Sequence, residues 1–411
     1  MNNSKDKSNS TKELYILFDF SCGRFYTHHS SYLKDYFDFL VSRNYHTKVW
    51  VNTSADKKVL DLFGNDVSAI LRSNYYSHTR RDNFLLFLAD YIVNCFVNIK
   101  IPSCIRSWIS SLYLSASIRE LKKYVKSGYR IKLIAPTLDG LGMRLIIKSL
   151  DLYPDNISLI AFRVTGAERR GLFGFENSLE VLKDICEIYL EKINIGYEVN
   201  AYGAKLLNSG VPEKNISWAP MPYISRGAES TTKKSQVSSP IKLGFLGSAR
   251  PNKGFDYIPK ILDALRNLQV NFLAFVQLPE FEWDEFKVTY NELIKNHKES
   301  IRLVSGGISK EELDQTINTV DLVVLPYKLE NYQLAGSGIL FLAADFKVPI
   351  AATKNLAFGW DIEVFNLGFL FEDAIDFSSK LKSFLVNSYD LNLEQYNSDR
   401  LNANLKFLQI T

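Results

Sequence analysis

The sequence predicts an α/β protein with two Rossmann-like domains that face each other across a ligand-binding cleft. Three observations support this fold class. The chain has 411 residues, enough for two domains of roughly 100–200 residues each. Buried-strand patterns alternate with amphipathic helical patterns in both halves, as in parallel sheets with crossover helices. Residues 224–240 are rich in Ser, Thr and Lys and lack periodicity, which is typical of a linker.

The first half begins with a polar tail, residues 1–13, which we expect to be disordered, and continues as a domain over residues 14–223. The apolar run Leu14–Phe20 predicts its first strand. The stripe formed by Leu33, Tyr36, Phe37, Leu40 and Val41 predicts a helix after it. Further strands are expected at 46–52, 130–136, 157–164, 195–199 and 216–220, and further helices at 140–152 and 201–210.

The second half repeats this order over residues 241–376, and a helical tail is expected over 377–411. Strands are expected at 241–247, 270–277, 300–306, 321–326, 349–353 and 368–373, and helices at 255–268, 309–320 and 338–346. Parallel sheets of this kind bind ligands at the carboxyl ends of their strands. The loops that follow these strands are therefore the places to look for a functional site.

The composition is that of a globular protein. Hydrophobic residues make up 46% and charged residues 23% of the chain, which excludes disorder as the main state. A net charge of +4 is too small to indicate a nucleic-acid partner. The four cysteines form no CxxC pair, so a zinc site of the usual spacing is not expected. The polar first residues lack the apolar core of a signal peptide, so we expect a cytoplasmic protein with reduced thiols.

Residues 80–132 differ from the rest of the first half. They hold ten Lys and Arg against three Asp and Glu, around an apolar stretch from Phe84 to Ile99. That stretch is short and polar for a membrane span. One interpretation is a basic, aromatic patch that contacts an anionic membrane surface. The other is a buried core helix with solvated basic flanks, and the sequence leaves both open.

The segment from Gly247 to Gly254, GSARPNKG, follows a predicted strand and opens a helix. A helix N-terminus offers free N–H groups and partial positive charge to anions. Gly247 permits close backbone approach, Arg250 can donate to two phosphate oxygens at once, and Lys253 adds a point charge. The segment therefore predicts a diphosphate site, although a solvated turn with two surface cations would show the same pattern.

A second candidate, Gly336-Ser337-Gly338, precedes the predicted helix at 338–346. Its small residues would let a ligand reach the helix amides. The alternative is a helix cap formed by Ser337, with glycine for turn geometry. Both candidates follow strands of one domain, so they are expected to line one cleft.

These motifs, with Asp321–Pro326, Tyr327 and the run VPIAAT at 348–353, resemble the C-terminal half of GT-B glycosyltransferases. The likeness is to family-4-like retaining enzymes of bacterial surface-polysaccharide assembly. It is good over 241–372 and looser over 14–223. The resemblance implies a nucleotide-sugar donor in the second domain and an acceptor in the first. Its donor-binding residues would be Gly247, Arg250, Lys253, Ser337, Gly338 and Ile339, and Arg250 and Lys253 would also stabilise the leaving diphosphate.

The chain departs from that family at two positions. The family often carries two glutamates eight residues apart around this helix, and their places here are Leu334 and Leu342. The second glutamate normally contacts the nucleoside ribose, so the resemblance leaves the nucleotide open. Glu330 could replace it from the preceding loop, or it could be a solvated loop acid. A degenerate, inactive domain is a further alternative.

The loop after the first strand, with Gly23, Arg24, His28 and His29, would lie near the acceptor in a GT-B enzyme. His28 or His29 could hydrogen-bond an acceptor hydroxyl or a phosphate, and either could instead be a helix-start residue without a catalytic role. The two adjacent side chains point to different faces, so they are not expected to share a metal.

Two further residues end predicted strands at the same edge of the first sheet. Asp139 could contact the acceptor or cap the next helix. Arg163 ends the strand at 157–164, and the resemblance allows it a phosphate or acceptor role.

The predicted function is that of a metal-independent, hexosyltransferase-like glycosyltransferase without a cofactor. It would move a sugar from a nucleotide-diphosphate donor to a glycan or lipid-linked glycan, with retention, in lipopolysaccharide, O-antigen or capsule synthesis. Its place would be the cytoplasm, at the inner face of the membrane if residues 80–132 bind lipid. The alternatives are a non-catalytic GT-B-shaped scaffold of a polysaccharide assembly complex and a sugar-nucleotide epimerase.

Overall fold

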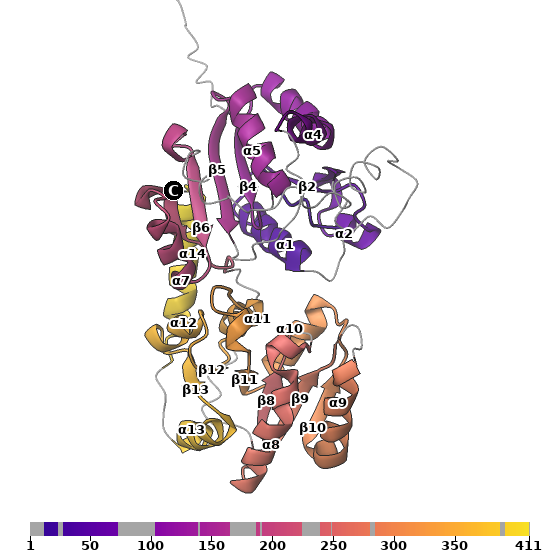
Figure 1. The fold of residues 1–411 in the computed structure, drawn as a ribbon, viewed down its shortest axis with the longest axis vertical. Helices are drawn as coiled ribbons and strands as arrows, with labels where there is room; N and C mark the ends of the chain where they lie inside the picture. The colour runs from indigo at the N-terminus through magenta and orange to yellow at the C-terminus, as the bar shows by residue number, and fades with distance from the viewer. Residues whose placement is uncertain are drawn as a thin grey trace, which may run out of the picture. The chain divides into compact units, whose positions relative to one another are not determined.

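The structure is a computed structural model with two parallel sheets, one of seven strands and one of six (Figure 1). Strands alternate with helices along the chain, which confirms the predicted α/β class. The residues that the structure describes are 12–23, 28–72, 103–138, 140–164, 186–189, 191–223, 239–247, 249–279, 284–386 and 391–410.

Contacts between residues divide the chain into two compact units, and the division does not follow a single point in the sequence. The first unit comprises Met1–Tyr197, Lys205–Ala219 and Leu405–Thr411. The second comprises Glu198–Ala204 and Pro220–Asn404. A short segment directly after a strand of the first sheet therefore packs with the second unit.

The sheet of the first unit has the order β3-β2-β1-β4-β5-β6-β7. Its strands are β1 (Glu13–Phe18), β2 (Thr47–Asn52), β3 (Val67–Leu71), β4 (Arg130–Ala135), β5 (Ile157–Val164), β6 (Ile193–Tyr197) and β7 (Ile216–Trp218). Strand order reverses between β1 and β4, where Ile16 pairs with Leu133. Ligands of open α/β sheets bind outside the strand ends at such a reversal.

The helices of this part of the chain are α1 (His28–Val41), α2 (Lys57–Asp61), α4 (Ser103–Lys126), α5 (Gly140–Leu152) and α7 (Asn200–Asn208). The predicted apolar stripe of α1 is buried except at Val41, which is 44% exposed. Val41 is the last residue of the helix, one position past Leu40, and so turns away from the sheet. The sequence reading missed α2, whose N-cap is Asp56: Val59 N–H donates to its carboxylate at 2.8 Å.

Helix α4 is the described part of the basic segment 80–132. Tyr113, Leu114, Ser117 and Leu121 are buried, and the helix packs against α5 and β3. Its lysines near the C-terminal end, such as Lys122, are exposed. For these residues, a core helix with basic flanks describes the arrangement, while residues 80–102 lie outside the described part. Among the described residues, no helix combines the length and apolar character needed to cross a membrane.

The sheet of the second unit has the order β10-β9-β8-β11-β12-β13, with a reversal between β8 and β11. Its strands are β8 (Ile241–Phe245), β9 (Phe272–Gln277), β10 (Ile301–Val304), β11 (Leu322–Leu325), β12 (Ile350–Thr353) and β13 (Gly368–Phe371). The helices are α8 (Ile258–Asn267), α9 (Asp284–His297), α10 (Lys310–Thr319), α11 (Gly338–Asp345), α12 (Gly359–Val364), α13 (Ala374–Val386) and α14 (Leu393–Phe407).

One hydrophobic core joins α8, α9 and α13 to this sheet. Phe377, Leu381 and Phe384 of α13 belong to it, so the start of the C-terminal helical region is part of the second unit. The helix expected at 255–268 begins instead with a 3₁₀ turn, Phe255–Tyr257, before α8. This tight start follows from Gly254, whose left-handed backbone turns the chain into the helix.

Candidate functional site

The candidate site lies at the reversal of the second sheet, where the loops after β8, β9 and β11 meet. Gly247 follows β8, and its N–H donates to the side-chain oxygen of Gln277 at 2.7 Å. Gln277 ends β9 and donates in turn to the Gly306 carbonyl at 3.1 Å. Sequence reasoning missed Gln277; the available sign was a polar residue at the carboxyl end of an otherwise apolar strand. Through its bond to the Gly247 N–H, Gln277 holds the loop after β8 in place.

Lys253 places a partly buried ammonium group against this loop. Its Nζ donates to the Gly247 carbonyl at 2.5 Å and lies 5.7 Å from the centre of the Tyr327 ring. Burial, and then the charge of Arg250, lower the pKa of Lys253 to about 8. Arg250 itself is exposed at the start of the same turn. The loop thus carries one partly buried and one exposed cation, and its role as a diphosphate site stays a prediction.

Two glycines permit this packing. Gly247 has φ +98°, and a Cβ there would lie 2.7 Å from Cγ1 of Ile339 and 3.1 Å from Nζ of Lys253. Gly254 has φ +69°, and a Cβ there would lie 1.8 Å from the Pro326 carbonyl oxygen. Because Gly247 touches Ile339 in the first turn of α11, the two candidate motifs of the sequence are brought together.

The N-terminus of α11 completes the site. Ser337 occupies the N-cap position but forms no capping hydrogen bond. Its hydroxyl and that of Tyr327 are buried and lie next to each other. A Cβ at Gly338 would meet nothing within 4 Å, so open space lies over the first turn of the helix. A small, open hollow at the Gly247 loop is lined by Gly247, Lys253, Gln277 and Tyr327 among others.

Leucines that are buried or partly buried occupy the two positions where the family often has glutamates. Leu342 is buried in α11, and Leu334 is partly buried in the loop before it. Glu330 is exposed on a 3₁₀ turn, Leu329–Asn331. Its suggested role at the ribose stays a prediction.

A different glutamate, which sequence reasoning missed, does reach the loop before α11. Glu198 comes directly after β6 and belongs to the second unit. It is buried, and a Cβ at Gly336 would lie 2.2 Å from its Oε1. The carboxylate therefore packs against the backbone of Gly336, which explains the glycine at that position.

The first unit has its own polar cluster at the reversal of its sheet. His29, at the start of α1, lies 2.8 Å (Nδ1) from the Asp19 carboxylate after β1 and 3.2 Å from the hydroxyl of Thr137 after β4. The Thr137 hydroxyl also donates to the Asp19 carboxylate, and the Ser21 N–H donates to the same carboxylate at 2.7 Å. Burial opposes ionisation of Asp19, but His29, Thr137 and the Ser21 N–H together hold its pKa below the usual value. A proton on Nδ1 directed at Asp19 leaves Nε2 of His29 as an acceptor.

The other acceptor-side candidates have varied surroundings. Gly23 is buried beside Asn52 and Ser54 at the end of β2. Arg163 is fully buried in β5, with its guanidinium 5.2 Å from the centre of the Tyr32 ring. Arg24, Asp139 and the side chain of His28 lie outside the described residues. Among the residues that are described, no group of three or more His, Cys, Asp or Glu is arranged to hold a metal ion.

Comparison with solved structures identifies the fold. A glycosyltransferase from Rickettsia africae matches with a TM-score of 0.60 at 14% identity, over 97% of this chain and 96% of that one. Anabaena HepE in complex with UDP and glucose matches at 0.58 and 11% identity, over 97% of both chains. WaaG, a glycosyltransferase involved in lipopolysaccharide biosynthesis, matches with a TM-score of 0.55 at 13% identity. The match covers 96% of this chain and 99% of that one. No protein-family model and no curated protein matches the sequence.

These matches span nearly the whole chain, and they agree with the two parallel α/β sheets described above. The resemblance to GT-B glycosyltransferases that the sequence motifs indicate is confirmed at the level of fold. The chain has the GT-B fold.

Proposed function

We propose that this protein is a glycosyltransferase that moves a sugar from a nucleotide-diphosphate-sugar donor to a hydroxyl group of a glycan or lipid-linked glycan. The observation that carries the proposal is the convergence of the Gly247 loop, the partly buried Lys253 ammonium and the N-terminus of α11 at one strand reversal. Free helix amides beside a desolvated cation form a strong anion site. A diphosphate fits the charge and the small residues there.

The same residues supply the chemistry that the transfer needs. As the bond between the anomeric carbon and the diphosphate breaks, negative charge grows on the departing phosphate oxygen. Lys253, Arg250 and the amides at Gly338 and Ile339 would stabilise that charge without rearrangement, which is often the largest contribution to catalysis. We propose that these groups make a metal ion unnecessary.

On the acceptor side, His29 is the favoured residue. Asp19 lies 2.8 Å from Nδ1 and so fixes the orientation of the ring. We propose that His29 orients the acceptor and that the donor phosphate takes the acceptor proton, with retention at the anomeric carbon. If His29 removed the proton itself, the product would be inverted, so product stereochemistry separates the two.

The finer assignment rests on resemblance. HepE binds UDP and glucose, and WaaG acts in lipopolysaccharide biosynthesis. We propose by analogy a uridine-diphosphate hexose donor and a role in bacterial surface polysaccharide synthesis at the inner face of the membrane. Within residues 80–132, where one face of α4 is buried against α5 and β3, we propose that the basic flanks make the membrane contact because of their positive charge.

The test is a donor panel with and without acceptor. Protein is incubated with UDP-, GDP- and ADP-hexoses and with lipid-linked glycan fragments, and products are analysed by NMR. A glycosyltransferase forms acceptor-dependent product. Product formed without acceptor would favour the epimerase, and no turnover together with no nucleotide binding would favour the scaffold; either result would contradict the proposal.

The proposed role of Lys253 also predicts a pH dependence. The charged form of a group whose pKa is about 8 is present below pH 8 and is lost as pH rises through that value. Affinity for a nucleoside diphosphate should therefore be level from pH 7 to 7.5 and fall above pH 8, approaching about tenfold per pH unit. Calorimetric titrations between pH 7 and 9.5 measure it. Lys253→Arg keeps its proton throughout and should abolish the fall; a level profile for the wild type would contradict the role.

A further inference from the structure

Two groups of opposite charge lie near the two ends of the stretch from Gly336 to Ile339, which leads into α11. On one side, Ile339 contacts Gly247 and Nζ of Lys253 lies next to the same glycine. On the other side, the carboxylate of Glu198 packs against Gly336. Ile339 is three positions after Gly336, so the two Cα atoms are at most about 11 Å apart. A single small ligand can therefore meet both groups.

The space between these groups is open and polar. Gly338 lies between them in the sequence, it is exposed, and its missing side chain would have met no atom. The Ser337 hydroxyl next to it is buried and lies beside the Tyr327 hydroxyl. A ligand over Gly338 would therefore be close to the helix amides, with Lys253 on the flank of Ile339 and Glu198 on the flank of Gly336.

The two flanks select different parts of a ligand. A carboxylate repels phosphate and accepts hydrogen bonds from hydroxyl groups, whereas an ammonium group attracts phosphate. We propose that Glu198 binds a hydroxyl group of the donor sugar, and so fixes the direction in which a sugar nucleotide lies and helps to select the sugar. This inference rests on the proposed function, because it assigns the sugar end of a donor whose diphosphate is held at Lys253.

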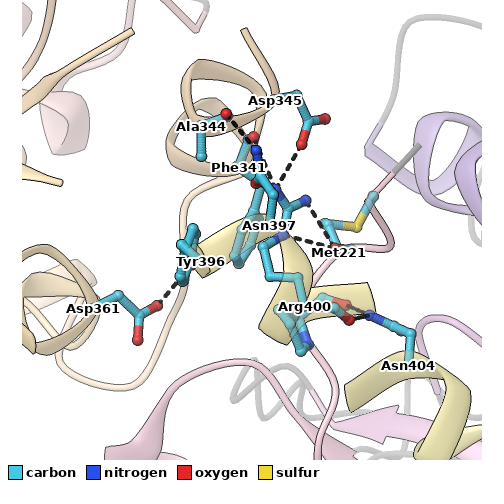
Figure 2. A network of polar contacts seen from close by, with 10 residues as sticks. Met221, Phe341, Ala344, Asp345, Asp361, Tyr396, Asn397, Arg400 and Asn404 are labelled. Atoms are coloured by element: carbon cyan, nitrogen blue, oxygen red, sulfur yellow. Dashed lines mark hydrogen bonds and ion pairs between the residues drawn. The ribbon is translucent and has the colours of Figure 1, made fainter. Parts of the chain in front are cut away.

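Glu198 also faces charged groups on the helices packed around it. Its charge acts on Asp361 of α12 and on Tyr396 of α14, whose hydroxyl donates to Asp361 at 3.1 Å (Figure 2). Burial, with Glu198 as a further cause, raises the pKa of Asp361 to about 7. Arg400 lowers the pKa of Asp361 but is itself paired with Asp345 at 2.6 Å. Asp361 is therefore a buried carboxyl group in the same cluster. A substitution of Asp361 serves as the control for effects of Glu198 that are only structural.

The test compares Glu198→Gln with the matched control Asp361→Asn in the full-length protein. Dissociation constants are measured by calorimetry for UDP and UDP-glucose, and for the GDP and ADP pairs if uridine nucleotides do not bind. Glu198→Gln should leave the affinity for the nucleoside diphosphate within about twofold and weaken the sugar nucleotide by about tenfold or more, as for loss of a charged hydrogen-bond partner. It should also reduce the preference between glucose and galactose donors. Asp361→Asn should change neither the affinity for the sugar nucleotide relative to the diphosphate nor the preference between glucose and galactose donors.

Other outcomes overturn the inference. If Glu198→Gln weakens diphosphate and sugar nucleotide equally, or leaves both unchanged, the carboxylate does not read the sugar. If both variants lower the unfolding midpoint and alter binding alike, Glu198 acts through packing. If the wild type binds none of the diphosphates, the proposed function itself fails. If the wild type binds and Glu198→Gln binds equally well, only the inference about Glu198 fails.

Discussion

Lys253→Ala is expected to lower kcat/KM for sugar transfer by about 10²–10³-fold, the usual effect of removing one donor from a desolvated anion site. The Lys253 ammonium is partly buried, donates to the Gly247 carbonyl at 2.5 Å and lies next to Gly247, which contacts Ile339 in the first turn of α11. No other described lysine is held by that carbonyl. The variant should fold, because the lost side chain leaves a hollow that is already open on one side.

The matched control is Lys328→Ala in the loop after β11. Lys328 is half-exposed and pairs with Asp256 at 2.9 Å on the surface, so it should retain wild-type kinetics. Initial rates at several donor concentrations, with unfolding midpoints for each variant, separate a catalytic loss from misfolding. Arg250→Ala should lower kcat/KM by less than Lys253→Ala does, since Arg250 is exposed. Wild-type rates from both Lys253→Ala and Arg250→Ala would contradict the assignment of the site.

Arg400→Met is expected to destabilise the protein by about 3–5 kcal/mol, because it leaves a buried carboxylate without its partner. Arg400 of α14 has no exposed side-chain surface, and it pairs with Asp345 at the end of α11. It also donates twice to the Met221 carbonyl, at 2.8 and 3.1 Å, and to the side-chain oxygen of Asn397 at 2.9 Å (Figure 2). One guanidinium thus ties α11, α14 and the segment at Met221 together.

Denaturant unfolding measures this effect, and Lys347→Ala provides the control. Lys347 forms an ion pair with Glu394 of similar length, 2.6 Å, but both side chains are more than half exposed. Solvent screens such a pair, so its loss should move the unfolding midpoint little. Adding Asp345→Leu to Arg400→Met should recover part of the loss, since it removes the unpaired charge. Equal effects of Arg400→Met and Lys347→Ala would contradict the role of the buried network.

Much of the fold could be predicted because buried parallel strands form continuous apolar runs. The runs at β1, β8 and β11 are of this kind, and each precedes a glycine or polar turn. Helix α9 was missed, although Phe286, Tyr290 and Leu293 have the spacing of a buried stripe. Helix α12 has six residues, too few for a periodic pattern to emerge.

The candidate site could be predicted in part for a similar reason. Gly247, Lys253 and Gly338 stand in short local motifs whose chemistry can be read from neighbouring residues. Gln277, Glu198 and Asp19 act through partners 30, 138 and 10 positions away, at Gly247, Gly336 and His29 respectively. Such pairs depend on strand order and on the packing of separate segments, which a single sequence does not display.

The most direct test of the central claim is calorimetric titration of the wild type and Lys253→Ala with UDP, GDP, ADP and the corresponding nucleosides. The account predicts that the wild type binds at least one diphosphate, that the matching nucleoside binds at least about tenfold more weakly because it lacks the charged contacts, and that Lys253→Ala removes most of this difference. A wild type that binds no diphosphate, or binds diphosphate and nucleoside equally, would contradict the account.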